Sequence, residues 1–136
     1  MQIFKTKSDL SSSLSSLADS LIGFVPTMGA LHNGHLELLR QAKKQCSVVV
    51  CSIFVNPTQF SNKEDFNSYP NTLSKDITKL EKINCDVLYV PDVSDLYTIN
   101  EKTKHFNLNG LDNVMEGKFR KGHFDGVAII IEKFFN

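Results

Sequence analysis

The chain has 136 residues, enough for one domain with a hydrophobic core, and its 41% hydrophobic and 22% charged residues are typical of a soluble globular protein. Fifteen basic residues balance fifteen acidic ones, so the net charge favours neither a nucleic acid nor an anionic membrane as a partner. No apolar stretch approaches the ~18 residues that a membrane-spanning helix needs, and the amino-terminal segment is too polar for a secretion signal, so we expect a cytoplasmic protein.

The amino-terminal region is expected to form a helix, a strand and a second helix. Leucines spaced three and four residues apart predict the first helix, with Ser8 or Asp9 as its cap. These leucines are Leu10, Leu14, Leu17 and Leu21. The apolar run LIGFVP predicts a buried strand that Pro26 ends, and a second helix is expected over Gly34–Gln45. The apolar side of that helix is expected to carry Leu38, Leu39, Ala42 and Cys46.

The middle of the chain contains a strongly apolar segment, SVVVCSIFV, which is typical of a central parallel strand covered on both faces. The cysteines are odd in number and lack Cys-x-x-Cys spacing, so buried free thiols in a reducing compartment are favoured over a disulfide or a zinc site. They are Cys46, Cys51 and Cys85. The polar segment that follows, NPTQFSNKEDFNSYPN, is expected to be a long functional loop.

Further elements are expected between this loop and the last residue. Thr72 is the expected cap of a helix, and the segment DVLYVP predicts a short strand. The apolar residues of that helix are Leu73, Ile77, Leu80 and Ile83. The segment KHFNLN alternates as a further strand would. The final segment, Gly122–Asn136, stays open, because its β-branched run favours a strand and its apolar spacing favours a helix.

The alternation of strands and helices predicts an α/β fold of the Rossmann-like, doubly wound kind with a parallel sheet. In such sheets, ligands bind beyond the carboxyl ends of the strands, near the amino-terminal ends of helices. The sequence HNGH lies at such a place, after the first strand, and NPTQF lies at another, after the second. We therefore expect the functional site to include both segments.

Two histidines, His32 and His35, lie at the first of these junctions. A purely structural role, metal ligation and phosphate binding are the three hypotheses. Zinc needs further ligands, and no Cys or acidic residue is spaced to supply them, so we expect no metal held by side chains of this chain. Phosphate binding explains more, because Gly29 and Gly34 let a phosphate approach the backbone, while the helix start and the imidazoles supply donors.

The sequence around these histidines resembles a known family. HNGH is similar to the His-x-Gly-His signature of the class I nucleotidylyltransferase superfamily. The segments PTMGALHNGH, SIFVNPTQF, YPNTL, EGKFRKGHF and GVAIIIEKFF resemble, in order and spacing, the pantothenate synthetase (pantoate–β-alanine ligase) family. The likeness runs from about Ile22 to the last residue. One departure is Lys121, where the family pattern has proline.

The resemblance implies a reaction, its cofactors and its partners. The family uses ATP and Mg²⁺ to join (R)-pantoate to β-alanine through a pantoyl adenylate, and its members are homodimers. His35 would then be the proton donor that assists pyrophosphate departure, and His32 would hold the phosphates. The implied ATP-binding residues are Met28, Gly29, Ala30, Leu31, His32, Asn33, Gly34 and His35. The implied pantoate and β-alanine residues are Gln59, Asn56, Phe54 and Met28, and further motif positions are Tyr69, Glu116, Arg120 and His123.

Each of these residues has a simpler explanation that the sequence leaves open. Gln59 can stabilise its own loop, Phe54 can belong to the core, and His123 can cap the last helix. Glu116 and Arg120, four residues apart, can form an ordinary ion pair. Two alternative functions stay open. The chain could belong to another adenylyltransferase of the superfamily, or it could be a non-catalytic fragment that binds a nucleotide or dimerises.

Family members are about twice as long as this chain. We therefore expect residues 1–136 to form an incomplete nucleotide-binding domain that lacks the second half of its sheet and a C-terminal lid domain. We expect such a fragment to lack appreciable ligase activity by itself. The first strand, LIGFVP, should then keep one unpaired side, which invites association with another chain.

Overall fold

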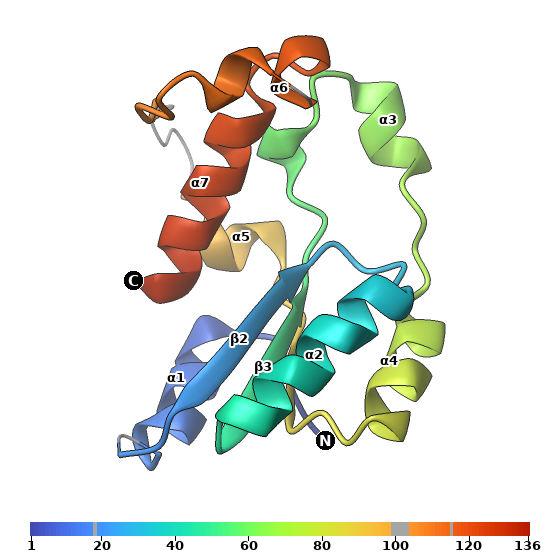
Figure 1. The fold of residues 1–136 in the computed structure, drawn as a ribbon, viewed down its shortest axis with the longest axis vertical. Helices are drawn as coiled ribbons and strands as arrows, with labels where there is room; N and C mark the ends of the chain where they lie inside the picture. Colours follow the sequence, from blue (N-terminus) through green and yellow to red (C-terminus); the bar gives the residue numbers. More distant parts are fainter. Residues whose placement is uncertain (18, 99–103, 115) are drawn as a thin grey trace. The chain divides into compact units, whose positions relative to one another are not determined.

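The structure is a computed structural model, and it describes residues 1–17, 19–98, 104–114 and 116–136. The side chains of Leu111 and Glu116 lie outside this description. The chain divides into two compact units (Figure 1). Residues Met1–Phe54 and Pro70–Leu96 form the first, here called the sheet unit, and Val55–Tyr69 and Tyr97–Asn136 form the second, the helical unit.

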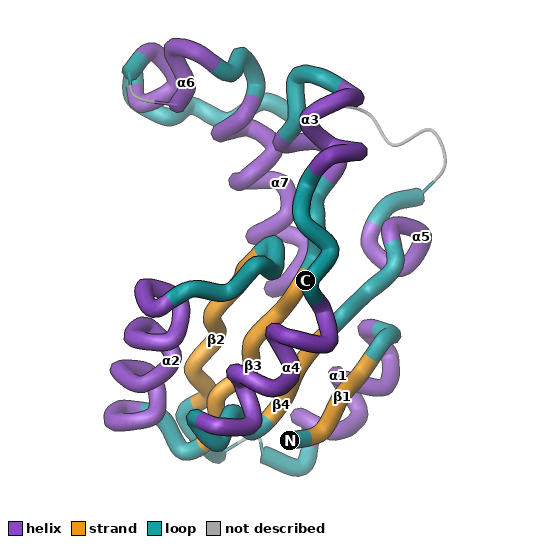
Figure 2. Tube along the Cα trace, turned by 90° about the vertical axis from the view of Figure 1, so that its right-hand side faces the viewer, coloured by secondary structure: helices purple, strands orange, loops and turns teal. Residues whose placement is uncertain are grey.

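A parallel four-stranded sheet is the centre of the sheet unit. Its strands are β1 (Gln2–Phe4), β2 (Ile22–Thr27), β3 (Val48–Ile53) and β4 (Val87–Tyr89). They lie side by side in the order β1-β4-β3-β2, and every pair is parallel (Figure 2). The predicted parallel α/β sheet is confirmed. Strand β1 was not expected, and within the described residues β2 lies at an edge and pairs with β3 alone.

Helices cover both faces of this sheet. α2 (Asn33–Gln45) and α4 (Leu73–Lys82) lie on one face, and α1 (Lys7–Ser15) lies on the other (Figure 1). A short helix, α5 (Val93–Leu96), follows β4. None of the helices in the described part of the chain combines the length and the apolar character needed to cross a membrane.

The main core lies between β3 and the helices α2 and α4. Leu39 of α2, Leu80 of α4 and Cys51 of β3 have no exposed surface. The remaining apolar stripe of α4 is confirmed, because Leu73, Ile77 and Ile83 pack against the same cluster. The stripe predicted for α2 was wrong at one position. Leu38 is 59% exposed, and Leu36 takes its place against the core, since Leu36 lies three residues before Leu39 on the same side of the helix.

Several predicted boundaries were wrong at the start of the chain. α1 ends at Ser15, so Leu17 and Leu21 lie beyond it, and Leu21 is exposed. Its cap is Thr6, whose hydroxyl accepts a hydrogen bond from the N–H of Asp9. Pro26 does not end its strand, which continues to Thr27. Proline lacks an N–H group, and an edge strand tolerates this where the missing group would face away from the neighbouring strand.

The helical unit contains short elements and one long helix. These are the 3₁₀ turns η1 (Pro57–Gln59) and η2 (Leu111–Asn113) and the helices α3 (Lys63–Ser68), α6 (Glu116–Phe119) and α7 (His123–Phe135). The long loop predicted over Asn56–Asn71 was therefore wrong, since it contains η1 and α3. The strand predicted from KHFNLN was also wrong, because these residues have no regular structure. The open question at the carboxyl-terminal segment is settled in favour of a helix, whose buried residues are Gly126, Ile129 and Ile130.

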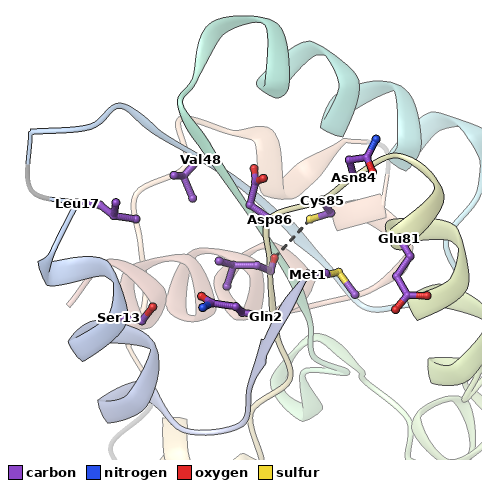
Figure 3. A pocket seen from close by; sticks show the side chains of 10 residues that line it. Met1, Gln2, Ser13, Leu17, Val48, Glu81, Asn84, Cys85 and Asp86 are labelled. Atoms are coloured by element: carbon purple, nitrogen blue, oxygen red, sulfur yellow. Dashed lines mark hydrogen bonds between the residues drawn. The ribbon is translucent and has the colours of Figure 1, made fainter.

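A cavity of about 420 Å³ opens at the amino ends of the strands (Figure 3). Gln2, Val48 and Val87, the first residues of three strands, line it together with Glu81, Asn84 and Asp86. The Sγ atom of Cys85 donates to the carbonyl oxygen of Val87 at its wall. The predicted nucleotide-binding segment lies at the carboxyl ends of the strands, so this cavity is not the predicted site.

Candidate functional site

A tight turn joins β2 to α2, and its backbone is unusual. Gly29 and Ala30 both have positive φ values, 81° and 49°. This region is open to glycine but costs energy for alanine, so other groups must hold the turn in place. The hydroxyl of Thr27 is one of them, because it accepts from the N–H of Gly29 at 3.1 Å and donates to the carbonyl oxygen of Ser52 at 2.8 Å.

A buried carboxylate from α4 holds the rest of the turn. Asp76 has no exposed surface. Its Oδ2 accepts from the N–H of Ala30 and its Oδ1 from the N–H of Leu31, each at 2.9 Å. The hydroxyl of Thr72 donates to the same carboxylate at 2.9 Å, so Thr72 binds Asp76 instead of capping the helix with its side chain. Lys79 donates from Nζ to the carbonyl oxygen of Leu31, which ties α4 to the turn again.

The two histidines cap the start of α2. Nδ1 of His32 accepts from the N–H of Gly34 at 3.1 Å, and Nδ1 of His35 accepts from the N–H of His32 at 3.3 Å. This is a capping box in which two imidazoles take the roles usually given to a hydroxyl and a carboxylate. The rings lie close together, with centroids 4.0 Å apart.

This cap fixes what the histidines offer to a ligand. A neutral imidazole whose Nδ1 accepts must carry its proton on Nε2, so each ring presents an Nε2–H donor. The expectation that free backbone N–H groups would receive a phosphate is wrong for much of the turn. The N–H groups of Gly29, Ala30, Leu31, His32 and Gly34 already donate within the protein. The donors toward an anion are therefore side chains more than backbone.

Burial and the neighbouring charges favour the neutral form of His35. Burial lowers the pKa of His35 below its ordinary value of 6.5, and the neighbouring His32 and Lys79 lower it further, while Asp76 opposes them. A neutral ring is what the cap requires, because a protonated Nδ1 cannot accept a hydrogen bond. His35 is half-buried and His32 is exposed, so the pair is open to a ligand from the side of His32.

Two of the three cysteines have thiols that burial makes less acidic. Cys51 and Cys85 are buried, and Cys46 is half-buried. Burial raises the pKa of Cys51 to about 12 and raises that of Cys85 as well. Thiols with raised pKa values are poor nucleophiles and poor metal ligands at neutral pH.

The second predicted segment, NPTQF, lies in the helical unit and is organised by Asn56. This side chain has no exposed surface. Its Nδ2 donates to the carbonyl oxygen of Gly126 at 3.0 Å. Its Oδ1 accepts from the hydroxyls of Tyr97, at 2.7 Å, and Thr58, at 3.1 Å. A Cβ atom at Gly126 would lie 2.5 Å from the carbonyl oxygen of Thr58, so only glycine lets α7 approach η1 this closely.

The other predicted residues of the helical unit lie around this turn. Nδ1 of His123 bonds the carbonyl oxygen of Gln59 at 3.1 Å, and because a carbonyl only accepts, this Nδ1 carries a proton. The cap of α7 is Gly122 and not His123. The ring of Tyr69 packs edge-on against that of Phe60. Nη2 of Arg120 lies 3.8 Å from Oδ2 of Asp65. The suggested ion pair of Arg120 with Glu116 falls on a side chain outside the described residues.

The structure thus gathers the predicted residues in two groups. The sheet unit holds Met28–His35, with Phe54 buried just after β3, where its N–H donates to the carbonyl oxygen of Thr27. The helical unit holds Asn56, Gln59, Tyr69, Arg120 and His123. Asp76 and Lys79 were not predicted as site residues from the sequence. The available signal was the position of Asp76, a charged residue three after Leu73 and four before Leu80 on the apolar stripe of α4.

Solved structures of pantoate-beta-alanine ligases superpose on this chain. The pantoate-beta-alanine ligase of Francisella tularensis, solved in complex with beta-gamma ATP and beta-alanine, is 44% identical and superposes with a TM-score of 0.92. The pantothenate synthetase of Thermus thermophilus is 38% identical, with a TM-score of 0.89. Each comparison covers 99% of this chain, but 52% of the first protein and 48% of the second.

Sequence comparison gives the same result. The pantothenate synthetase of Acinetobacter baumannii is 49% identical over 119 residues, which are 88% of this chain and 42% of that protein. That of Flavobacterium psychrophilum is 46% identical over 138 residues, 99% of this chain and 49% of that protein. The chain spans about half the length of these relatives. The profile of the family described as pantoate-beta-alanine ligase matches residues 2–136, and the chain therefore belongs to the pantoate-beta-alanine ligase family.

Proposed function

We propose that this chain provides the nucleotide-binding part of an enzyme that joins (R)-pantoate to β-alanine at the expense of ATP. The observation that carries the proposal is the pair of Nε2–H donors that His32 and His35 present at the carboxyl end of a parallel sheet. The Francisella relative was solved with beta-gamma ATP and beta-alanine, which supports these ligands. The domain that we assign to residues 1–136 is an incomplete nucleotide-binding domain, to which a C-terminal lid would be added.

The reaction that we assign has two displacements. A carboxylate oxygen of pantoate attacks the α-phosphorus of ATP, the bond from that phosphorus to the β-phosphate bridging oxygen breaks, and pyrophosphate leaves. The amine of β-alanine then attacks the acyl carbon, AMP leaves with the former carboxylate oxygen, and the amine releases a proton. Charge accumulates on phosphate oxygens in the first step, where preorganised donors lower the barrier most.

His32 and His35 take this role as hydrogen-bond donors. Their Nδ1 atoms are occupied by the helix cap, so their Nε2–H groups remain as donors for ATP. Because burial and neighbouring charges favour the neutral form of His35, we assign it hydrogen bonding to the departing pyrophosphate in place of full proton transfer. The ATP-binding residues that we assign are Met28, Gly29, Ala30, Leu31, His32, Asn33, Gly34 and His35.

The residues assigned to pantoate and β-alanine divide into two kinds. Met28 and Gln59 are half-buried, which leaves part of each side chain for a substrate. Phe54 and Asn56 are buried, and the hydrogen bonds of Asn56 are made within the helical unit. We therefore assign Met28 and Gln59 to substrate contact, and Phe54 and Asn56 to shaping the segments that carry them. Tyr69, Glu116, Arg120 and His123 stay candidates on family grounds alone.

We further propose that Mg²⁺ accompanies ATP, that the protein is a homodimer and that it works in the cytoplasm. No group of three His, Cys, Asp or Glu side chains suited to a metal occurs among the described residues, and the carboxylate of Asp76 already accepts from two N–H groups and a hydroxyl. Phosphate oxygens and water, the usual magnesium ligands in nucleotide sites, would hold the ion. Sedimentation across a concentration series tests the dimer.

Binding and exchange experiments test the function. We expect the 136-residue chain to bind ATP, with His35→Ala weakening this binding. Pantoate-dependent exchange of pyrophosphate into ATP identifies the first step, and exchange with a different acid would point to another adenylyltransferase. Because the chain spans about half of its relatives, we expect no appreciable pantothenate synthesis from it. Synthesis at about 1 per second or more, an ordinary enzymatic rate, would contradict this expectation. Failure to bind ATP would refute the assigned site.

A further inference from the structure

The turn that begins the proposed ATP site has the shape of an anion receptor. Consecutive N–H groups in a backbone with positive φ form a small concave nest that normally receives a phosphate or another anion. Here Gly29 and Ala30 have positive φ, and the N–H groups of Ala30 and Leu31 point to the two oxygens of one carboxylate. The nest is filled by the protein's own anion, Asp76.

Burying this carboxylate is costly, so its placement calls for a reason. A fully buried carboxylate loses its hydration, and the loss is offset only when donors surround it. Asp76 has two backbone N–H groups and the hydroxyl of Thr72 as donors, while the ammonium of Lys79 lies 3.8 Å away. Thr72 and Lys79 belong to α4 and its cap. The other close partners of Asp76, Ala30 and Leu31, belong to the turn before α2. The carboxylate therefore acts on that turn.

The conformation of this turn sets where the histidines stand. Leu31 directly precedes His32, the residue that caps α2, and the N–H of His32 is bound to His35. Fixing Ala30 and Leu31 fixes the first residue of the capping box and so the direction of both imidazoles. A ligand that meets donors already in place does not have to order them, which improves its affinity.

We propose that Asp76 is the positioning residue of the ATP site: its carboxylate holds the Met28–Leu31 turn in the bound conformation before nucleotide arrives. Asp76 does not touch the nucleotide in this scheme. It acts through the backbone of Ala30 and Leu31, and Thr72 supports it. This inference rests on the proposed function, since it supposes that the turn and His32 and His35 receive ATP.

A purely structural role would have different consequences, and the chain offers a matched control. Asp86 also accepts from a backbone N–H, that of Val49 at 2.9 Å, and also has a lysine beside it, Lys43 at 3.3 Å. It lies at the amino end of β4, at the cavity described above and away from the turn. Asp76→Asn and Asp86→Asn therefore each replace a carboxylate that accepts from a backbone N–H, at opposite ends of the strands, with the side chain of Asp86 39% exposed and that of Asp76 1% exposed.

The experiment compares these variants with the unaltered chain by calorimetric titration with ATP and Mg²⁺, at a temperature where each is folded. Asp76→Asn keeps the shape of the side chain but replaces one carboxylate oxygen by an NH₂ group. This NH₂ group is a donor and cannot accept from the N–H of Ala30 or Leu31. We expect its dissociation constant for ATP to rise about tenfold or more, and that of Asp86→Asn to change by less than about twofold. Thr72→Val, a milder change that keeps both N–H bonds, should lie between them. Amide hydrogen exchange of Ala30 and Leu31 should quicken in Asp76→Asn and, to a smaller extent, in Thr72→Val, but not in Asp86→Asn.

The outcomes separate the inference from the function on which it rests. An unaltered chain that does not bind ATP overturns the proposed function and the inference with it. ATP binding by the unaltered chain with equal affinity in Asp76→Asn overturns the inference alone. Equal weakening in Asp76→Asn and Asp86→Asn also overturns it, because it would assign the effect to general destabilisation. If Asp76→Asn does not fold, weakened ATP binding with quickened exchange at Ala30 in Thr72→Val supports the inference, and unchanged values of both overturn it.

Discussion

Two buried polar side chains, Asp76 in the sheet unit and Asn56 in the helical unit, each hold a turn that carries predicted site residues. Neither has any exposed surface. Asp76 meets donors only, two N–H groups and a hydroxyl, whereas Asn56 meets hydroxyl donors on one side and the carbonyl oxygen of Gly126 on the other. An ionised carboxylate only accepts, but an amide both accepts and donates. The identity of each residue follows from the partners that its turn presents.

Exchanging carboxylate and amide at these two positions tests whether the partners of each turn determine the residue. Asn56→Asp should have the largest effect on stability. The new carboxylate would lose the hydrogen bond to Gly126 and would bury a charge whose close donors are the hydroxyls of Thr58 and Tyr97. We expect a loss of about 3–5 kcal/mol of unfolding free energy at pH 7, the range for an uncompensated buried charge. Burial would raise the pKa of this carboxyl, so the loss should shrink as the pH falls and the carboxyl becomes protonated.

Denaturant titrations at pH 7 and pH 5 measure this effect. Asn62→Asp is the control, because Asn62 is exposed and caps α3 through its Oδ1, a role that aspartate fills equally well. An Asn56→Asp chain as stable as Asn62→Asp at pH 7 would show that the amide is not required.

The reverse exchange, Asp76→Asn, should cost less. The amide keeps one acceptor and sets its NH₂ group against the N–H of either Ala30 or Leu31. Leaving one buried N–H without a partner costs about 1–3 kcal/mol, and no charge has to be buried. The same denaturant titrations measure it. A loss larger than that of Asn56→Asp would contradict the comparison.

The close approach of α7 to η1 gives a third prediction. Alanine is normally better than glycine inside a helix by about 1 kcal/mol. At Gly126, however, the added Cβ would meet the backbone of Thr58 and Gln59 at 2.5–2.9 Å, so we expect Gly126→Ala to destabilise the chain by about 1–3 kcal/mol. Thermal unfolding decides the sign. A stabilised variant would show that η1 can move away without cost, and that Asn56 does not fix it.

The smallest expected effect is the pH dependence of the histidine cap. The folded-state pKa of His35 is lowered from 6.5, so the unfolded chain binds a proton more readily than the folded one. The stability from neutral His35 is fully present above pH 6.5 and is lost as the pH falls through the lower folded pKa. His35→Gln keeps an acceptor at this position of the capping box but does not titrate, so it should lose less stability on acidification.

Unfolding measured from about pH 8 to pH 5 tests this difference, since this window spans the ordinary titration range of histidine. His123→Gln is the control, since Nδ1 of His123 donates to Gln59 and this bond does not require a neutral ring. Identical pH profiles for His35→Gln and the unaltered chain would remove His35 from the stability of the cap.

The sequence by itself determined the elements whose evidence is local. The periodicity of Leu73, Ile77, Leu80 and Ile83 predicted α4, and the β-branched run around Val49 predicted β3, because an apolar face repeats with the period of its own backbone. The order of these elements also predicted the parallel sheet and the place of the histidine turn at the carboxyl ends of its strands. Motif resemblance added the family.

Only the tertiary structure decided the features that depend on partners far along the chain. β1 is three residues long and exists because it pairs with β4, whose Val87 lies opposite Gln2. KHFNLN alternates as a strand does, but no neighbouring strand completes it among the described residues. The role of Asp76 depends on amides 45 and 46 residues earlier. The periodicity of apolar residues can be recognised from residues close together in the sequence. A hydrogen-bond partner such as Asp76 lies far along the chain, and only the fold brings α4 beside the turn before α2.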